Sequence, residues 1–277
     1  MRSLAFVSLV LVASPVFAGS VANQVINYTP GSASASFQNS SAALGLPNGD
    51  TGYGSLNPFN PAFSNTDIVS VGGGGSMTLK LDQAVGTGAG SALGVFSNVG
   101  IVDESWSPDY SSGGTGLAGS PVSTFSDPGA GYVSVSNDGT TWYTKTATGW
   151  ALSTAGGAVL TTFDNPGNAY TDSTLDFGYG SIGTQSADYF KPFTGTLNDF
   201  AGKAYNDGTT DDILHLLNGS AGGNWLSLDG LPIDSVDYVK FDVPSDQRVI
   251  IDAVTAVPEP AILGLLGVGG LLMRRRR

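Results

Sequence analysis

The sequence predicts an all-β protein whose body is a single β-sandwich or jelly roll, and two observations carry this prediction. The first is composition: 40 of the 277 residues are Gly, Asp is abundant, and Glu occurs only as Glu104 and Glu259. Asp, Asn, Gly and Ser favour turns, whereas the scarce Glu, Lys and Arg favour helices. The second is that several short segments alternate apolar and polar residues with a period of two, which is typical of half-buried strands.

The alternating segments follow one another along the chain. Residues 21–28 form the first, and residues 77–81 ("MTLKL") place Met77, Leu79 and Leu81 on one face. Many short strands separated by turn residues favour a sandwich over a helical or mixed fold. Glycine-rich stretches, such as residues 72–76, are expected to be loops. Three later segments are also predicted to be strands: 93–102, 236–243 and 248–254.

A β-hairpin is predicted in the middle of the chain. In "YVSVS" (132–136), Val133 and Val135 point to the same side, and "NDG" (137–139) supplies residues that accept a positive φ before "TTWYTK" returns the chain. Only "DDILHLLN" (211–218) has helical character, and it holds His215, the single histidine.

The N-terminal segment, residues 1–18, is typical of a secretory signal peptide. Arg2 supplies the positive charge, residues 4–12 form an apolar core too short to span a bilayer, and Val16 and Ala18 are small residues at the −3 and −1 positions. Cleavage after Ala18 is therefore expected. It would leave residues 19–257 as the β-sandwich body, with no strong internal domain boundary.

The C-terminal segment, residues 258–277, combines a Pro-Glu-Pro triplet, an apolar run and an arginine cluster. The run over residues 261–273 would extend about 20 Å as a short hydrophobic helix, which is short for a hydrocarbon core of about 30 Å. A transient stop in the membrane suits this length better than a permanent tail anchor. The motif residues are Pro258, Glu259, Pro260, Arg274, Arg275, Arg276 and Arg277.

This segment resembles the PEP-CTERM sorting signal. The resemblance implies processing by an exosortase, a membrane cysteine protease, in a Gram-negative-type bacterium that makes extracellular polysaccharide. It also implies an exported protein of the cell surface or matrix. The body resembles galactose-binding-like, discoidin-type jelly rolls in "YTPGSASASFQNSSAALGLP", "YVSVSNDGTTW" and "DSVDYVKFDV…IIDAV". That second resemblance implies the sandwich but no particular ligand.

Charge and cysteine content exclude several classes of function. The formal net charge is −12, and residues 19–257 hold six basic against 22 acidic side chains, a charge of −16. Nucleic-acid binding needs clustered Lys and Arg and is therefore not expected. With no cysteine in the chain, disulfides, thiolate zinc sites and a cysteine nucleophile are ruled out.

Calcium is the one cofactor that the sequence suggests. Ca²⁺ takes carboxylate and loop carbonyl oxygens, and Asp252 alternates in phase with Ile250 and Val254, which predicts a carboxylate on a shared face. The discoidin-type resemblance implies a structural Ca²⁺ between an early loop and the late strands, with Asp50 and Asp252 as candidates. An inward charge that protects an edge strand, or a turn aspartate, is the alternative, and residues 206–212 are another Asp-rich loop.

Sugar contacts are expected from aromatic residues in loops, with Trp106 and Trp225 as candidates. Asp103 and Glu104 are adjacent, and neighbouring residues on a strand point to opposite faces, so they do not make a glycosidase pair. His215 is expected to be packed or on the surface. The sequence thus predicts a non-enzymatic, structural or adhesive exported protein. A carbohydrate-binding module is the alternative, and a glycan hydrolase comes third.

Overall fold

A computed structural model of the chain describes residues 19–33, 35–47, 61–98, 100–101, 124–125, 130–146, 149–152, 161–162, 188–195, 197–200, 202–203 and 213–258. Every structural statement below refers to these residues. The predicted signal peptide, residues 259–277, and the candidate residues Asp50 and Trp106 lie outside them.

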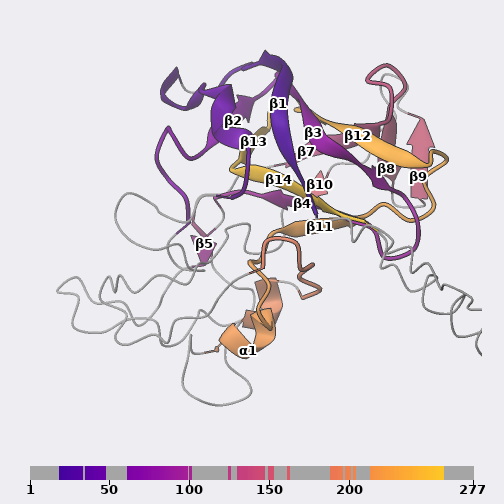
Figure 1. Cartoon of the computed structure of the whole chain (residues 1–277). Coiled ribbons are helices and arrows are strands. Elements are labelled where there is room, and N and C mark those ends of the chain that lie inside the picture. The colour runs from indigo at the N-terminus through magenta and orange to yellow at the C-terminus, as the bar shows by residue number, and fades with distance from the viewer. Residues whose placement is uncertain are drawn as a thin grey trace, which may run out of the picture.

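One large antiparallel sheet makes up most of the fold (Figure 1). Its strand order is β11-β4-β14-β1-β3-β12-β7-β8-β9, with β10 also pairing with β7. The strands are β1 (Ser20–Thr29), β3 (Ser76–Gly86), β4 (Ala92–Phe96), β7 (Ala130–Ser136), β8 (Tyr143–Thr146), β9 (Gly149–Leu152), β10 (Thr161–Thr162), β11 (Asn224–Ser227), β12 (Ser235–Asp242) and β14 (Ala253–Val257).

Two smaller sheets and four short helices complete the described structure. β2 (Val69–Gly72) pairs with β13 (Arg248–Ile251), and β5 (Gly100–Ile101) pairs with β6 (Thr124–Phe125). The helices are η1 (Ala35–Phe37), η2 (Ser40–Ala43), η3 (Leu197–Phe200) and α1 (Ile213–Leu217). The predicted short helix is thus present as α1, and His215 on it is exposed.

The large sheet curls into a sandwich because β1 belongs to both halves. Its first residues pair with β14, Ser20 with Ala256 and Val21 with Thr255, and the rest of β1 pairs with β3. Figure 1 shows β14, β4 and β11 lying across from β3, β12 and β7. The two halves bury one common apolar cluster between them, so the all-β sandwich prediction is confirmed. The cluster includes Leu79, Val133 and Val239 from one half and Val95, Val254 and Ala256 from the other.

The predicted hairpin is confirmed in β7 and β8. Ser134 pairs with Thr144, Val135 pairs with Tyr143, and Val133 and Val135 are both buried in the core. In the turn, Gly139 adopts a φ of 72°, a value that glycine reaches without steric cost.

The prediction of a single strand over residues 248–254 is wrong. The chain bends at Asp252, so β13 pairs with β2 whereas β14 pairs with β1 and β4. The bend shifts the alternation: Ile251 and Val254 both enter the main core, and Ala253 packs with Phe96 instead. The shared face expected for Ile250, Asp252 and Val254 therefore does not form. Residues 93–102 likewise hold two strands, β4 and β5, rather than one.

The glycine run between β2 and β3 is a turn that packs closely against two other loops, one at Ser32 and Ala33 and one at Ser245. A Cβ on Gly72 would lie 2.2 Å from the backbone nitrogen of Ala33, and one on Gly73 would lie 2.1 Å from the carbonyl oxygen of Ser245. Such distances leave no room for a side chain. The loop predicted for residues 72–76 is thus present at residues 73–75, and its close packing brings Ser32 and Ser245 beside β2.

Candidate functional site

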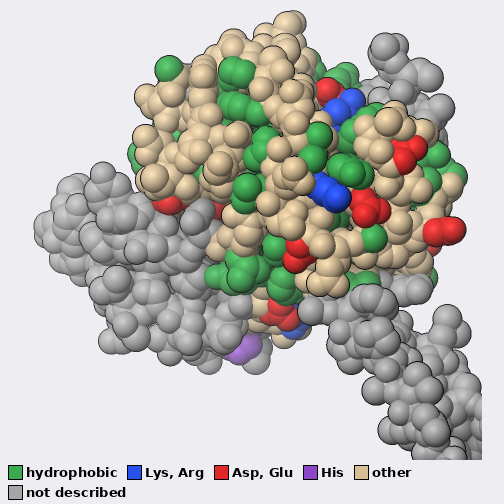
Figure 2. Space-filling view, turned by 45° about the horizontal axis from the view of Figure 1, so that its top comes forward, with side chains coloured by type: hydrophobic (Ala, Val, Ile, Leu, Met, Phe, Trp, Pro, Cys, Tyr) green, Lys and Arg blue, Asp and Glu red, His purple; other side chains and the backbone are tan. Residues whose placement is uncertain are grey.

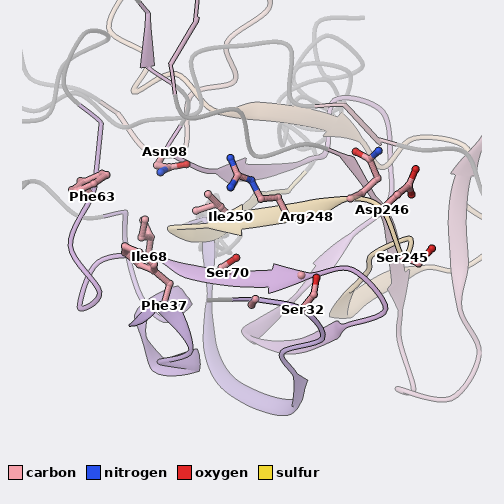
Figure 3. Close-up of a pocket in the computed structure, with 13 residues that line it drawn as sticks. Ser32, Phe37, Phe63, Ile68, Ser70, Asn98, Ser245, Asp246, Arg248 and Ile250 are labelled. Carbon is pink, nitrogen blue, oxygen red and sulfur yellow. The ribbon is translucent and has the colours of Figure 1, made fainter. Parts of the chain in front are cut away.

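A cleft of about 720 Å³ lies over the two-stranded sheet of β2 and β13 (Figure 3). β2 and β13 form the floor of this cleft. Successive side chains of a strand point to opposite faces, so alternate residues of these strands face the cleft. Val69, Val71, Val249 and Ile251 enter the main core, whereas Ser70, Arg248 and Ile250 line the cleft on the other face.

Aromatic and aliphatic side chains form one part of the cleft. Ile68 and Ile250 are buried in a small apolar cluster against which Phe37 packs. The rings of Phe37 and Phe63 meet edge to face, with centroids 6.4 Å apart and an interplanar angle of 65°. Phe63 is 58% exposed although it is a large apolar residue. An exposed ring held by a neighbouring ring offers a fixed apolar surface to a ligand.

Asn98 supplies a buried acceptor to the cleft. It is 2% exposed, and its Oδ1 atom makes no hydrogen bond among the described residues. An unsatisfied buried acceptor costs about 1–3 kcal/mol. In Figure 3, Asn98, Ile250 and Arg248 lie along one side of the cleft, with Phe37, Ser70 and Ser32 along the other.

Several hydrogen bonds hold the polar end and the floor of the cleft in place. Ser32 Oγ accepts a hydrogen bond of 2.8 Å from the backbone nitrogen of Gly73. Tyr28 Oη, on β1, donates one of 2.7 Å to the carbonyl oxygen of Ser70, which ties the floor to the main sheet. Burial raises the pKa of Tyr28 above its usual value, so this donor keeps its proton at neutral pH.

The ionisable groups of the cleft balance one another. Asp246 and Arg248 are the two charged residues in the described part of its lining, and they carry opposite signs. The remaining polar lining consists of hydroxyl, amide and backbone groups. This cleft can thus accept and donate several neutral hydrogen bonds beside an apolar wall, an arrangement suited to a ligand with one apolar and one hydroxylated face.

Asp252 is the calcium candidate that lies within the described residues, and it is fully buried at the bend between β13 and β14. Its backbone nitrogen donates a hydrogen bond of 2.9 Å to the carbonyl oxygen of Phe96. The pKa of Tyr189 is raised by burial and, second, by the negative charge of Asp252. Within the described ranges, no three His, Cys, Asp or Glu side chains gather closely enough to hold a metal ion. Since Asp50 lies outside those ranges, calcium binding stays a prediction.

Trp225, the described sugar candidate, was expected in a loop, but it lies on strand β11, paired with β4. Its Nε1 donates a hydrogen bond of 2.8 Å to the carbonyl oxygen of Gly222, and its ring meets Phe96 edge to face with centroids 6.2 Å apart. Trp225 does not line the cleft over β2 and β13. The contact predicted for it stays a prediction, as does that for Trp106.

Phe37, Phe63 and Asn98 were missed by sequence reasoning. Phe63 could have been noticed, because it is an aromatic residue in a Pro- and Asn-rich stretch with no strand alternation. Asn98 carries no such signal. It gains its role from the three-dimensional path that brings the end of β4 over β13.

Of the predicted sorting motif, only Pro258 lies among the described residues, directly after the end of β14 at Val257. Ala18, Glu259, Pro260 and the four arginines lie outside. Among the described helices, none has the length and apolar character needed to cross a membrane. No family model matches the chain, and no curated protein matches it either.

Proposed function

We propose that this chain is an exported protein of the cell surface or extracellular matrix that an exosortase sorts through residues 258–277. The carrying observation is the order of Pro258-Glu259-Pro260, apolar run and arginine cluster behind a signal peptide. The position of β14 supports it: this strand, the last of the described residues, ends at Val257, so removal of the sorting segment would leave β14 intact. Contact with the membrane is transient in this proposal, during export and sorting.

The body then has a structural or adhesive role in a polysaccharide-rich envelope or biofilm of a Gram-negative-type bacterium. Its surface supports this role over nucleic-acid binding. Figure 2 shows few charged side chains on the face in view, with basic and acidic groups next to one another. Lys240 Nζ lies 2.8 Å from Asp242 Oδ2, for example. With six basic against 22 acidic side chains, residues 19–257 offer a phosphate backbone few cations to contact.

The test is to express the full chain in a host with an exosortase and to measure the intact mass of the protein released at the surface. The expected mass corresponds to a chain that begins at Gly19 and lacks the arginine cluster. A Pro258→Ala/Pro260→Ala variant is expected to stay in the membrane fraction with its full C-terminal mass.

The matched control is Pro244→Ala, which changes a proline in the turn between β12 and β13 and should be released as the unaltered chain is. Release of a protein that still carries Arg274 to Arg277 would contradict the sorting proposal. Release that does not depend on an exosortase in the host would contradict the proposed partner.

A carbohydrate-binding module is the second candidate function, and the cleft over β2 and β13 favours it. The cleft combines an exposed aromatic ring with a buried amide acceptor. A protein that binds polysaccharide directly would be retained in a matrix without any covalent link. Binding of this kind and sorting by an exosortase can operate in the same chain.

A further inference from the structure

The geometry points to the cleft over β2 and β13 as a binding site for neutral pyranose units of a polysaccharide. Phe63 would contact the apolar C–H face of a sugar ring, and Asn98 Oδ1 would accept a hydrogen bond from one of its hydroxyl groups. This site is separate from the Trp106 and Trp225 positions expected from the sequence. The inference rests on the second candidate function, carbohydrate binding, and does not depend on export or sorting.

The buried amide of Asn98 sets the polar requirement of the ligand. A side chain that is 2% exposed and has an Oδ1 atom without a hydrogen bond is a poor choice for stability alone. Asn98 lines the cleft, and its Oδ1 atom is shielded from bulk water. A ligand hydroxyl that donates to it would satisfy the atom and regain a hydrogen bond in a site of low dielectric.

The aromatic pair sets the apolar requirement. Phe63 is 58% exposed, and its edge-to-face partner Phe37 packs against the apolar cluster of Ile68 and Ile250. A sugar ring has an apolar C–H face and hydroxyl groups around its rim, so it can contact the phenyl group and reach Asn98 at the same time. The volume of about 720 Å³ falls within the usual range for small-ligand sites.

The charges of the cleft select neutral sugars over uronates and phosphorylated ligands. Among the described residues of the lining, Arg248 is the single cation, and Asp246 lies two residues from it with the opposite charge. The chain as a whole has a formal charge of −12, so a polyanion would be repelled on approach. A fatty acyl chain suits the site less well, because it would leave the Asn98 Oδ1 atom without a hydrogen-bond partner.

Isothermal titration calorimetry on the full chain, in a zwitterionic detergent that contains no sugar, tests this assignment. The probes are pentasaccharides of glucose, mannose and galactose, with oligogalacturonate of equal length and palmitate as comparators. We expect at least one neutral pentasaccharide to bind and both comparators to fail. In Phe63→Ala, the affinity is expected to fall about tenfold, a loss of about 1.4 kcal/mol. Ile26→Ala, on β1 away from the cleft, also removes a large exposed apolar side chain, 47% exposed, and should bind as the unaltered chain does.

Asn98→Leu separates a binding role from a structural one. Replacing an unsatisfied buried acceptor with an apolar side chain of similar size does not lower stability. The variant is therefore expected to keep or raise its melting temperature while its affinity for the sugar falls at least tenfold. A residue kept for folding would show a lower melting temperature and no specific loss of binding.

Three results would overturn the assignment. Failure of every neutral pentasaccharide to bind would exclude the proposed ligand class. Equal affinities of Phe63→Ala and Ile26→Ala would place any sugar site elsewhere on the chain. Saturable binding of palmitate or oligogalacturonate that is lost in Phe63→Ala would keep the cleft as a site but exclude neutral sugars as its ligand.

Discussion

The indole ring of Trp225 lies directly over Gly94, its partner on the neighbouring strand. The two residues face each other in the β11–β4 ladder, and a Cβ on Gly94 would lie 2.8 Å from Trp225 Cη2. The same Cβ would lie 2.9 Å from Thr255 Oγ1 on β14. Gly94 therefore makes room for the packed tryptophan between two adjacent strands.

Gly94→Ala is expected to destabilise the fold by about 1–3 kcal/mol, because the added methyl group must displace Trp225 or Thr255. Thermal unfolding followed by tryptophan fluorescence measures the loss and any change in the surroundings of Trp225. Gly86→Ala is the matched control, since a Cβ there meets only the carbonyl oxygen of Asp234 at 3.9 Å. If the two variants melt at the same temperature, the close packing of Trp225 on Gly94 is wrong.

Asp138 gives the β7–β8 hairpin a stabilising charge that depends on pH. Hydrogen bonds from the backbone nitrogens of Thr141, at 2.7 Å, and Thr140, at 2.8 Å, hold the pKa of Asp138 well below its usual range. A carboxylate with a lowered folded-state pKa contributes stability above its unfolded pKa of about 3.9, and this contribution is lost as the pH falls below it. At pH 7, Asp138→Ala should melt at a lower temperature than the unaltered chain.

The difference in melting temperature caused by Asp138→Ala is expected to narrow as the pH falls from about 5 to 2. Asp138→Asn is the control, because its amide oxygen can still accept from Thr140 and Thr141 but carries no charge. At pH 7, Asp138→Asn should melt at a temperature between those of Asp138→Ala and the unaltered chain. The difference between the two variants should change little as the pH falls. A difference between Asp138→Ala and the unaltered chain that is constant with pH would contradict the role of the charge.

Tyr28 connects the floor of the cleft to the main sheet through its hydrogen bond to Ser70. Tyr28→Phe removes this single bond and is expected to cost about 0.5–1.5 kcal/mol. Because the folded-state pKa of Tyr28 is raised, the stability linked to its proton is present below pH 10 and is lost as the pH rises above 10. The margin of the unaltered chain over Tyr28→Phe should therefore shrink in alkaline solution.

Denaturant unfolding at pH 7, 9 and 11 measures this margin. Tyr238→Phe is a suitable control, since it removes the hydroxyl group of another half-buried tyrosine and keeps the ring that lies under Lys80 Nζ, 5.5 Å away. A margin for Tyr28→Phe that grows above pH 10 would contradict the sign of the predicted linkage.

Calcium binding can be tested through Asp252. A Ca²⁺ ion held by the folded chain would stabilise it by mass action, so the melting temperature should be higher in millimolar Ca²⁺ than in EDTA. Asp252→Asn removes one negative ligand and is expected to abolish this difference. Equal melting temperatures of the unaltered chain in Ca²⁺ and in EDTA would leave the buried carboxylate with a structural role alone.

The sandwich could be predicted because its core strands alternate locally. Met77, Leu79 and Leu81, for example, share a face in the sequence and all lie in the core. The division of the last strand could not be predicted, because the bend at Asp252 depends on pairing with β2 on one side and with β1 and β4 on the other. Alternation along a chain does not tell which sheet each half of a strand will join.

The cleft was hidden for a similar reason. Phe37 follows β1, Phe63 precedes β2, and Asn98 follows β4, so three separate segments must meet before the site exists. The sequence search for sugar contacts also favoured the larger aromatic residues. Trp225 shows the weakness of that preference, because its ring packs against Phe96 and Gly94 within the protein.

The pairing of Ser20 with Ala256 has a mechanical consequence. The start of β1 and the end of β14, the first and last described strands, therefore lie at the same corner of the sandwich. A force that pulled the two ends apart would act together on the pairing of Ser20 with Ala256, on the hydrogen bonds that Ser20 Oγ donates to Asp82 and Gln83 of β3, and on the pairing of Val257 with Ala92 of β4.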